Sequence, residues 1–307
     1  MLDELARAVT GHCPGFWVES AVPRLSLVAA DEAPAVVDMM YTPMLCFVAS
    51  GAKRATAGDH SALVEAGHMF VSSLELPVTA TFERLPYRSV VLTLDEQVLA
   101  DLLLELGEAA RLPEPDPGGV VSTPMGPELI DAVTRWVRLL DAPRDIGPLA
   151  GRIEGEILYR LLGGPLGPVL RQFALADSHV TQVRRVAGWI RENHASPLRV
   201  EAVAAMATMS TATLHRHFRR ATGMSPLQYQ KVVRLQEARR LLVAGDTTAA
   251  IVGERVGYAS ATQFNREYRR AYGVPPAQDA VRLRAQLLRT SARRQAPAVT
   301  AVQNASA

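Results

Sequence analysis

The sequence predicts an α+β multidomain fold: short strands near the N-terminus, a helical segment in the middle, and a C-terminal all-α domain that uses one unit twice. Three observations lead to this prediction. The phrase RRATGMSP at residues 219–226 returns almost unchanged as RRAYGVPP at residues 269–276. Residues 1–175 carry 13 Lys and Arg against 23 Asp and Glu, whereas residues 176–307 carry 20 against 8. Between residues 15 and 94, short apolar runs alternate with glycine and proline.

Residues 15–94 are expected to form many short β-strands. The apolar runs are PRLSLVAA, PMLCFVAS, HMFVSS, VTATFER and SVVLTL. Turn signals separate them at Gly51, Gly58, Gly67, Pro77 and Pro86. We expect either a small barrel or a jelly roll, because strand spacing alone does not separate these two folds.

From residue 95 to residue 175 the pattern becomes helical. The helical stretches are DEQVLADLLLELGEAA, PELIDAVTRWVRLLDAP and PLAGRIEGEILYRLLGG, and the Pro- and Gly-rich loop LPEPDPGG follows the first of them. Apolar stripes of this kind can pack on the strand domain or on a second copy of the chain. The stripes are Ile130, Val133, Val137 and Leu140, and Ile153, Ile157 and Leu161.

The two C-terminal copies pair similar residues when they are aligned fifty positions apart. The pairs are Ser210 with Ser260, Leu214 with Phe264, Arg216 with Arg266, Phe218 with Tyr268, Gly223 with Gly273, and Pro226 with Pro276. In each copy the serine is a good N-cap, large apolar residues stand four and eight positions later, and a glycine follows at a C′ position. Each copy therefore predicts a short helix with one inward apolar face.

A short Ala- and Val-rich segment precedes each of these helices, which is the spacing of a helix-turn-helix unit. The turn of the second copy holds one extra residue, because Ala204 lies six positions before Ser210 and Gly253 lies seven before Ser260. Between the units, SPLQYQKVVRLQEARRLLVAG predicts a long helix that acts as a rigid spacer. Such a spacer suits two successive major-groove segments, which lie ~34 Å apart on B-DNA.

The outward face of each short helix carries hydrogen-bonding and cationic side chains. Because the C-terminal part is strongly basic, we expect this face to meet double-stranded DNA. Arginine can pair bidentately with guanine and asparagine with adenine, whereas arginines at the helix ends suit phosphates. The candidate DNA-binding residues are Thr211, Ala212, His215, Arg216, Arg219 and Arg220 in the first helix, and Ala261, Thr262, Asn265, Arg266, Arg269 and Arg270 in the second.

Many anchor residues stand at the spacing of one known family. They are Ser210, Leu214, Arg216, Phe218, Gly223-x-Ser225-Pro226, Val256-Gly257-Tyr258-x-Ser260, Phe264, Arg266, Tyr268 and Gly273-x-Pro275-Pro276. With these anchors, residues 180–280 resemble the DNA-binding domain of the AraC/XylS family of bacterial transcription regulators. The resemblance implies a seven-helix domain whose two recognition helices enter adjacent major grooves.

The chain departs from this family at two places. Gly253 stands where the family usually has alanine, which costs about 1 kcal/mol of helix propensity. Asp279 and Ala280 replace the usual Tyr-Arg after the last proline. The buried anchors Val256, Phe264 and Tyr268 remain, so we still expect the second unit to fold.

Residues 51–92 carry a second family pattern. Its marks are Gly51-x-Lys53, Gly58, Ala66-Gly67, Leu76-Pro77 and Pro86-Tyr87. This stretch is similar to the N-terminal domain of one AraC-family subgroup. The resemblance implies a cupin-like barrel that binds a small effector, and it does not define the ligand.

The sequence offers little support for an enzyme. His60, Glu65 and His68 stand where a metal cupin has ligands, but the chain lacks the His-x-His pair, and it lacks nucleotide-binding and nucleophile motifs. We therefore predict no metal, no cofactor and no catalytic residue. Cys46, in the apolar run MLCFVA, is expected to be a buried thiol. With no signal peptide and no membrane-length apolar run, we expect a cytoplasmic protein.

The predicted domains are a cupin-like sensor domain at 1–94, a helical linker or dimerisation segment at 95–175, an AraC-type DNA-binding domain at 176–290 and a disordered tail at 291–307. Together they predict a sequence-specific DNA-binding transcription regulator controlled by a small effector. The partners to test are double-stranded DNA, this effector and a second copy of the chain. Two alternatives stay open at this stage. One is a cupin-type metalloenzyme with an appended DNA-binding module, and the other is a constitutive DNA-binding protein whose barrel serves assembly.

Overall fold

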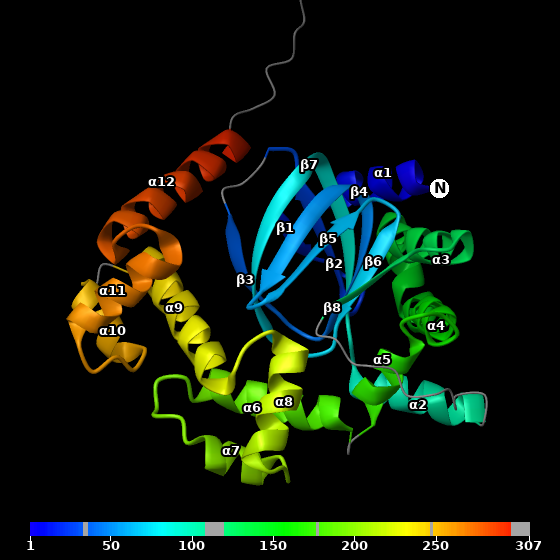
Figure 1. The fold of residues 1–307 in the computed structure, drawn as a ribbon. Coiled ribbons are helices and arrows are strands. Elements are labelled where there is room, and N and C mark those ends of the chain that lie inside the picture. The colour runs from blue at the N-terminus through cyan, green and yellow to red at the C-terminus, as the bar shows by residue number, and fades with distance from the viewer. Residues whose placement is uncertain (33–35, 108–119, 176–177, 246–247, 296–307) are drawn as a thin grey trace, which may run out of the picture. The chain divides into compact units, whose positions relative to one another are not determined.

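The computed structural model describes residues 1–32, 36–107, 120–175, 178–245 and 248–295 (Figure 1). Its chain forms two compact units. Unit 1 comprises Met1–Asn193 and Leu198–Gln230, and unit 2 comprises His194–Pro197 and the chain from Lys231 onward. In the described part, no helix combines the length and the apolar character that a membrane crossing requires.

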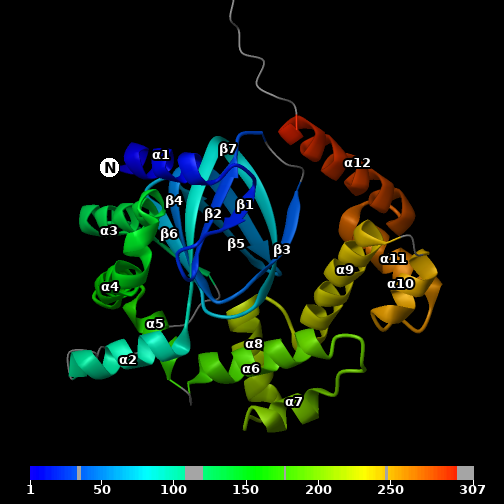
Figure 2. The same ribbon diagram turned by 180° about the vertical axis from the view of Figure 1, so that it is seen from behind.

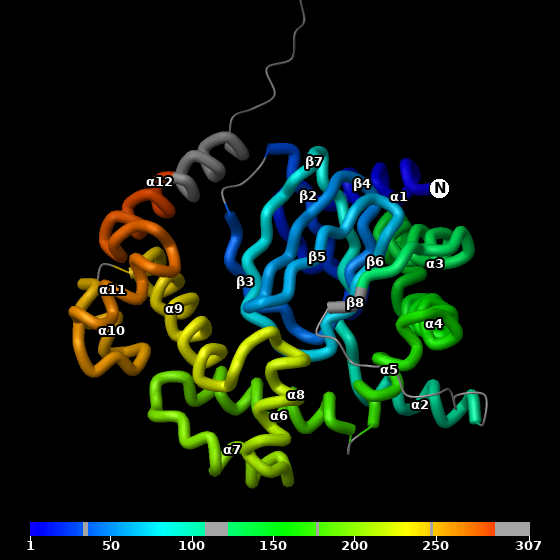
Figure 3. Tube along the Cα trace, viewed as in Figure 1, coloured from blue at the N-terminus to red at the C-terminus, as the bar shows by residue number. Residues whose placement is uncertain are grey.

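Unit 1 is built around one antiparallel sheet of eight strands. The strands are β1 (Trp17–Glu19), β2 (Leu25–Ala30), β3 (Val37–Tyr41), β4 (Met44–Ala57), β5 (His60–Glu65), β6 (His68–Ser72), β7 (Leu76–Thr93) and β8 (Val120–Pro124). Their order is β1-β2-β7-β4-β6-β8, with β3 paired to β7 and β5 paired to β4. The two longest strands, β4 and β7, run side by side through the sheet (Figure 3).

Among the described residues, eight α-helices lie wholly in unit 1 and flank or follow the strands. They are α1 (Leu2–His12), α2 (Glu96–Leu106), α3 (Pro127–Arg138), α4 (Pro143–Leu162), α5 (Gly167–Ala174), α6 (His179–Glu192), α7 (Val200–Met206) and α8 (Thr211–Thr222), and a 3-10 helix, η2 (Leu139–Asp141), joins α3 to α4. They are followed by α9 (Pro226–Ala244), α10 (Ala249–Arg255), α11 (Ala261–Tyr272) and α12 (Pro276–Gln295). The boundary between the two units falls inside α9, after Gln230. Counting from α6 to α12, the described residues contain the seven C-terminal helices that the family resemblance implies.

The largest core lies between one face of the sheet and the helices α1, α3, α4 and α5. Leu45, Phe47 and Ala49 alternate onto this face of β4, as strand geometry requires. Trp136 of α3 and Phe173 of α5 fill the helical side, and both are buried. Figures 1 and 2 show α1, α3 and α4 together beside the sheet.

The apolar stripes of the middle segment belong to this core. Val133, Val137, Ile157 and Leu161 are all at most 1% exposed within one chain. These side chains are therefore already used within unit 1. Dimerisation through the segment 95–175 stays a prediction, and it would need residues other than the buried ones of these stripes.

The predicted fold class is confirmed: an N-terminal antiparallel β domain precedes a helical region with helix-turn-helix units. Cys46 is a buried free thiol, as expected. Gly58 and Gly67 mark turns between strands, as predicted. Gly51, Pro77 and Pro86, however, do not separate strands.

Gly51 lies inside β4, and Pro77 and Pro86 lie inside β7. The pairing of these two strands shifts register between Val48 and Lys53. The Gly51 and Pro86 signals therefore mark a bulged stretch of two long strands, because a bulge tolerates a glycine at positive φ and a residue without an N–H.

Three segments differ from the predicted pattern. The N-terminal α1 was not expected, and the strand β8 lies within the segment predicted to be helical. The sequence VVSTP is rich in β-branched residues, and its backbone pairs with β6 as an additional edge strand. At the other end, α12 continues to Gln295, into the predicted tail, because Ala, Gln, Leu and Arg favour helix there. The connector LPEPDPGG and residues 296–307 lie outside the described residues.

Candidate nucleic-acid interface

The first helix-turn-helix consists of α7 and α8. Ser210 caps α8 by accepting a hydrogen bond from the Thr213 N–H at 3.1 Å. Gly223 ends the helix at φ 71°, the left-handed conformation typical of a C-terminal glycine. Leu214 and Phe218 are fully buried, so the opposite side of α8 faces outward.

The second helix-turn-helix consists of α10 and α11 and repeats this design in unit 2. Ser260 caps α11 through the Gln263 N–H at 3.5 Å, and Gly273 ends it at φ 77°. Phe264 and Tyr268 are fully buried in a cluster with Val252. The predicted start, stop and inward face are thus confirmed for both helices.

The turns of the two units differ by the one residue that the sequence predicts. The Met209 N–H donates to the Ala204 carbonyl, and the Tyr258 N–H donates to the Gly253 carbonyl, both at 2.9 Å. These bonds place Met209 and Tyr258 at equivalent positions. Ala259 is then the extra residue, and it lies between the closed turn and the cap of α11. The insertion leaves the recognition helix unchanged.

All twelve candidate DNA-binding residues are exposed. They are Thr211, Ala212, His215, Arg216, Arg219 and Arg220 on α8, and Ala261, Thr262, Asn265, Arg266, Arg269 and Arg270 on α11. Each helix therefore presents its predicted polar face to solvent. Contact of these residues with bases or phosphates remains a prediction.

The exposed face of α8 is strongly basic. Its sequence, TATLHRHFRRAT, contains no acidic residue. The His217 ring packs 4.3 Å from the His179 ring of α6. Burial lowers the pKa of His217, and the charges of His179 and Arg216 lower it further. These effects favour the neutral form of His217, whereas Arg216, Arg219 and Arg220 are permanent cations of α8.

In α11 the acidic residue Glu267 is turned to other partners. Its carboxylate lies 3.2 Å from Lys231 Nζ and accepts a 3.0 Å hydrogen bond from the Tyr258 hydroxyl. Arg266, Arg269 and Arg270 have no ion-pair partner among the described residues. These three cations are thus available to an external anion.

Asp279, one of the family departures, is the buried centre of unit 2. Its carboxylate accepts hydrogen bonds from Arg239 Nε at 2.8 Å, from the Tyr268 hydroxyl at 2.9 Å and from Arg282 at 2.8 Å. The corresponding residue of the first copy is Tyr229, which packs edge-on against Phe218. In the first unit, aromatic rings thus connect α8 to α9. In the second unit, the hydrogen bonds and ion pairs of Asp279 connect α11 to α12.

The sheet domain contacts the end of α8 within unit 1. The Asp59 N–H donates to the Gly223 carbonyl at 3.1 Å, and Arg219 donates to the Asp59 carboxylate at 2.8 Å. Gly58 and Gly223 meet backbone to backbone, because a Cβ at either would come within 2.5 Å of the other segment. Tyr229 adds a hydrogen bond to the Glu75 carbonyl at 2.8 Å.

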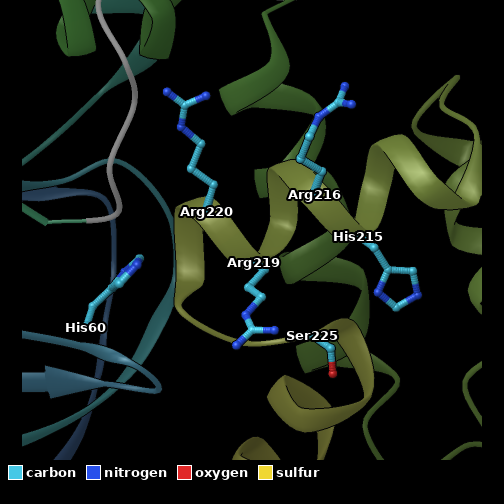
Figure 4. A pocket seen from close by; sticks show the side chains of 6 residues that line it. All are labelled: His60, His215, Arg216, Arg219, Arg220 and Ser225. Carbon is cyan, nitrogen blue, oxygen red and sulfur yellow. The ribbon is translucent and has the colours of Figure 1, made fainter.

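A basic hollow of about 550 Å³ opens beside this contact. Figure 4 shows the arginines spreading from α8 and His60 of β5 near them. The lining residues are His60, His215, Arg216, Arg219, Arg220 and Ser225. Sequence reasoning identified the four residues on α8, but it missed His60, Asp59 and Ser225 as neighbours. No local signal links the β4–β5 turn to residues more than 150 positions later.

The three cupin-ligand positions do not come together as a metal site in the described part of the chain. Glu65 forms an ion pair with Arg84, and His60 lines the basic hollow. Among the residues that the structure describes, no group of three His, Cys, Asp or Glu side chains is placed to hold a metal ion.

Two known sequence families match this chain. The AraC-type transcriptional regulator N-terminus matches residues 21–169, and a helix-turn-helix domain matches residues 203–280. The HTH-type transcriptional activator RhaS of Salmonella schwarzengrund (strain CVM19633) is 30% identical over 151 residues, covering 48% of this chain and 53% of that protein. RhaS of Klebsiella pneumoniae (strain 342) is 30% identical over 111 residues, covering 35% of this chain and 40% of that protein. The chain thus spans about half or less of these relatives.

The fold is shared with a solved structure. Wild-type ToxT from Vibrio cholerae strain SCE256, in a structure with unsaturated fatty acid bound, matches with a TM-score of 0.53 at 10% identity, over 83% of this chain and 92% of that one. At this identity the likeness concerns the fold alone. Since both family patterns match and both helix-turn-helix units are formed, the chain belongs to the AraC/XylS family of transcription regulators, with an AraC-type N-terminal domain and a helix-turn-helix DNA-binding region.

Proposed function

We propose that this regulator reads a specific DNA sequence with the exposed faces of α8 and α11 and that a small molecule bound by the N-terminal domain controls this binding. The observation that carries the first part is the repetition of one basic, capped helix with its polar face exposed in both units. In this proposal Arg216, Arg266 and Asn265 contact base edges, and the arginines near the helix ends contact phosphates.

The second part of the proposal rests on the N-terminal domain. Its sequence matches an AraC-type N-terminus, and the ToxT structure of the same fold is described as fatty-acid-bound. A homodimer and a cytoplasmic location remain predictions. Control by an effector is supported by the contact between the β4–β5 turn and α8, because a change in the sheet domain can reach a recognition helix there.

The test of base reading uses the full chain, because α8 belongs to the same compact unit as the sheet. Bound fragments are first recovered from the source genome to define a site. Arg216→Ala and Arg266→Ala are then measured by fluorescence anisotropy on this site and on random DNA. We expect each to lose roughly 1–3 kcal/mol, about 5- to 150-fold, on the site and much less on random DNA.

The matched control is Arg144→Ala, which removes an exposed arginine from α4. It should leave both affinities nearly unchanged. Equal losses on specific and random DNA for Arg216→Ala and Arg266→Ala would show that neither arginine reads bases.

A further inference from the structure

The loop between α6 and α7 belongs to a different compact unit from the two helices that it joins. Residues His194–Pro197 cluster with unit 2, whereas α6 and α7 belong to unit 1. We call these four residues the α6–α7 loop. The chain therefore passes between the units three times, after residue 193, after residue 197 and, inside α9, after residue 230. Two units joined only through α9 would have one connection, and the loop provides two more.

Arg234 of α9 holds this loop by its backbone. The guanidinium donates hydrogen bonds to three successive carbonyl oxygens, those of His194 at 2.6 Å, Ala195 at 3.3 Å and Ser196 at 3.1 Å. Hydrogen bonds from a charged donor are stronger than those between neutral groups, and the planar guanidinium holds its donors in a fixed arrangement. One side chain thus fixes the path of three loop residues within unit 2.

The turn of the second helix-turn-helix contacts the same loop. A Cβ at Gly257 would lie 2.1 Å from the Ala195 carbonyl oxygen and 2.8 Å from Ala195 Cα. The turn can come this close because Gly257 has no side chain, and glycine also tolerates its φ of 90°. Arg234 and Gly257 therefore both restrain Ala195.

Arg234 also contacts a residue that orients α11. Its Cζ lies 5.8 Å from the ring centre of Tyr258, the residue that closes the turn before α11. The Tyr258 hydroxyl donates a 3.0 Å hydrogen bond to Glu267 of α11, and Glu267 lies 3.2 Å from Lys231 of α9. The loop is thus connected to the second recognition helix through Arg234, Tyr258 and Glu267.

Short connections join the loop to α6 and α7. Asn193 is the one residue between α6 and the loop, and its backbone and side-chain N–H groups both donate to the Trp189 carbonyl at 2.9 Å. Leu198 and Arg199 lie between the loop and α7. Two extended residues span at most about 7 Å, so a larger shift of the loop must move α7. Because α7 and α8 form the first helix-turn-helix, the position of the loop affects the first recognition helix.

We propose that Arg234 is a positioning residue that sets the spacing between the two DNA segments this regulator accepts. By holding the α6–α7 loop in unit 2, it limits how far the first recognition helix can shift relative to the second. The inference rests on the proposed function, because it takes α8 and α11 to read the two segments. One base pair of B-DNA advances the groove by about 3.4 Å and turns it by about 35°, a change that a loose connection accommodates and a fixed one does not.

The test uses the full chain and the site recovered from the source genome. Single-base changes that no longer matter to Arg216→Ala locate the segment read by α8, and those found with Arg266→Ala locate the segment read by α11. One or two base pairs are then inserted or removed between the segments, and affinities are measured by fluorescence anisotropy. Wild-type protein should lose at least about tenfold at each altered spacing, since one recognition helix then misses its bases.

Arg234→Met removes the guanidinium and keeps an unbranched apolar side chain beside the Tyr258 ring. The ratio of affinities between native and altered spacing should fall to about threefold or less, and partial unfolding cannot cause this fall because it lowers every affinity by the same factor. Arg234→Lys, which restores a cationic donor without the planar fork, should give an intermediate ratio. The control is Arg240→Met on the same helix, which removes an arginine paired with Glu237 and should keep the wild-type ratio.

Tyr258→Phe is a milder variant that decides the question if neither Arg234 variant folds. It keeps the ring beside Arg234 and removes the hydrogen bond to Glu267, so it should lower the spacing ratio by a smaller factor.

A wild-type ratio in both Arg234 variants, or in Tyr258→Phe where neither of them folds, would overturn the inference and leave base reading by α8 and α11 intact. Wild-type protein that binds every spacing equally well would also overturn it. Equal losses on the site and on random DNA for Arg216→Ala and Arg266→Ala would instead show that the proposed function is wrong, and the inference would fall with it.

Discussion

Gly253 of α10 packs directly against the ring of Phe264 on α11. A Cβ at residue 253 would lie 2.9 Å from Phe264 Cγ and 3.0 Å from Cδ1, closer than side chains normally approach. The corresponding residues of the first unit are Ala204 and Leu214, both buried. The smaller Gly253 of α10 therefore faces the larger Phe264 of α11. The size of the Phe264 ring explains why glycine stands where the family usually has alanine.

Gly253→Ala should destabilise unit 2, although alanine favours helix by about 1 kcal/mol. Overpacking against a rigid ring costs about 1–3 kcal/mol, so we expect a net loss near 1 kcal/mol. Combining it with Phe264→Leu recreates the pairing of the first unit. The double variant should be more stable than the sum of the single effects by about 1 kcal/mol. Hydrogen exchange of the α10 and α11 amides measures this coupling.

The matched control is Gly188→Ala in α6, where nothing lies within 4 Å of a new Cβ. That change should stabilise its helix by roughly 0.5–1 kcal/mol. If Gly253→Ala proved equally stabilising, close packing against Phe264 would not be the reason for the glycine.

Asp279→Ala should unfold or severely loosen unit 2. The change leaves Arg239, whose side chain is only 12% exposed, without its carboxylate. Breaking a buried pair costs about 3–5 kcal/mol. Tyr268→Phe, which removes one hydrogen bond to the same carboxylate, should cost about 1 kcal/mol. Urea unfolding followed by circular dichroism reports both, and Glu237→Ala, from an exposed pair with Arg240, should cost less than about 1 kcal/mol.

Thr208→Gly should stabilise the first unit. Thr208 adopts φ 52° in the turn before α8, and Gly257 adopts φ 90° at the equivalent place before α11. A β-branched residue is strained in this region, so glycine there should gain about 1 kcal/mol. Gly257→Ala should have the opposite sign and a larger size, since its Cβ would lie 2.1 Å from the Ala195 carbonyl oxygen. Thermal melting of each variant checks the two signs, and a loss of stability in Thr208→Gly would contradict the strain.

Asp59→Asn should strengthen DNA binding by the full chain. The Asp59 carboxylate forms an ion pair with Arg219 at 2.8 Å. Removing this negative charge makes the Arg219 guanidinium available to a DNA phosphate. We expect a gain of a few-fold at low salt and a salt dependence steeper by about one unit. Glu83→Gln, which removes a carboxylate paired with Arg54 of the same sheet, is the control of equal charge. In a chain that also carries Arg219→Ala, Asp59→Asn should give no gain in DNA affinity. An equal gain in affinity from Glu83→Gln would show that the change in net charge alone causes the effect.

Local signals in the sequence predict the helix-turn-helix units well. Ser210 and Ser260 cap the helices, the left-handed Gly223 and Gly273 end them, and four-residue spacing identifies the buried faces. These features depend on residues within one or two turns of helix, so a single segment contains the information.

Features that depend on distant partners were not predicted. The network around Asp279 and the Asp59–Arg219 contact join segments that are remote in sequence, and β8 is stabilised by pairing with β6. The sequence pattern predicts strand boundaries at Pro77 and Pro86, inside the long β7. Glycine and proline occur both at a bulge within one strand and at a turn between two strands, so the pattern does not separate these two cases. Tertiary pairing decides between them, and it leaves no local signature.

Leu198–Gln230 belong to the same compact unit as the sheet. This limits where the chain can be cut and joined to a related regulator. A hybrid joined at residue 176 would separate Glu75 from Tyr229 and Asp59 from Arg219. Joining after Gln230 keeps those partners on one side of the junction. Domain exchanges between relatives should therefore carry the first helix-turn-helix with the sheet and exchange only the second.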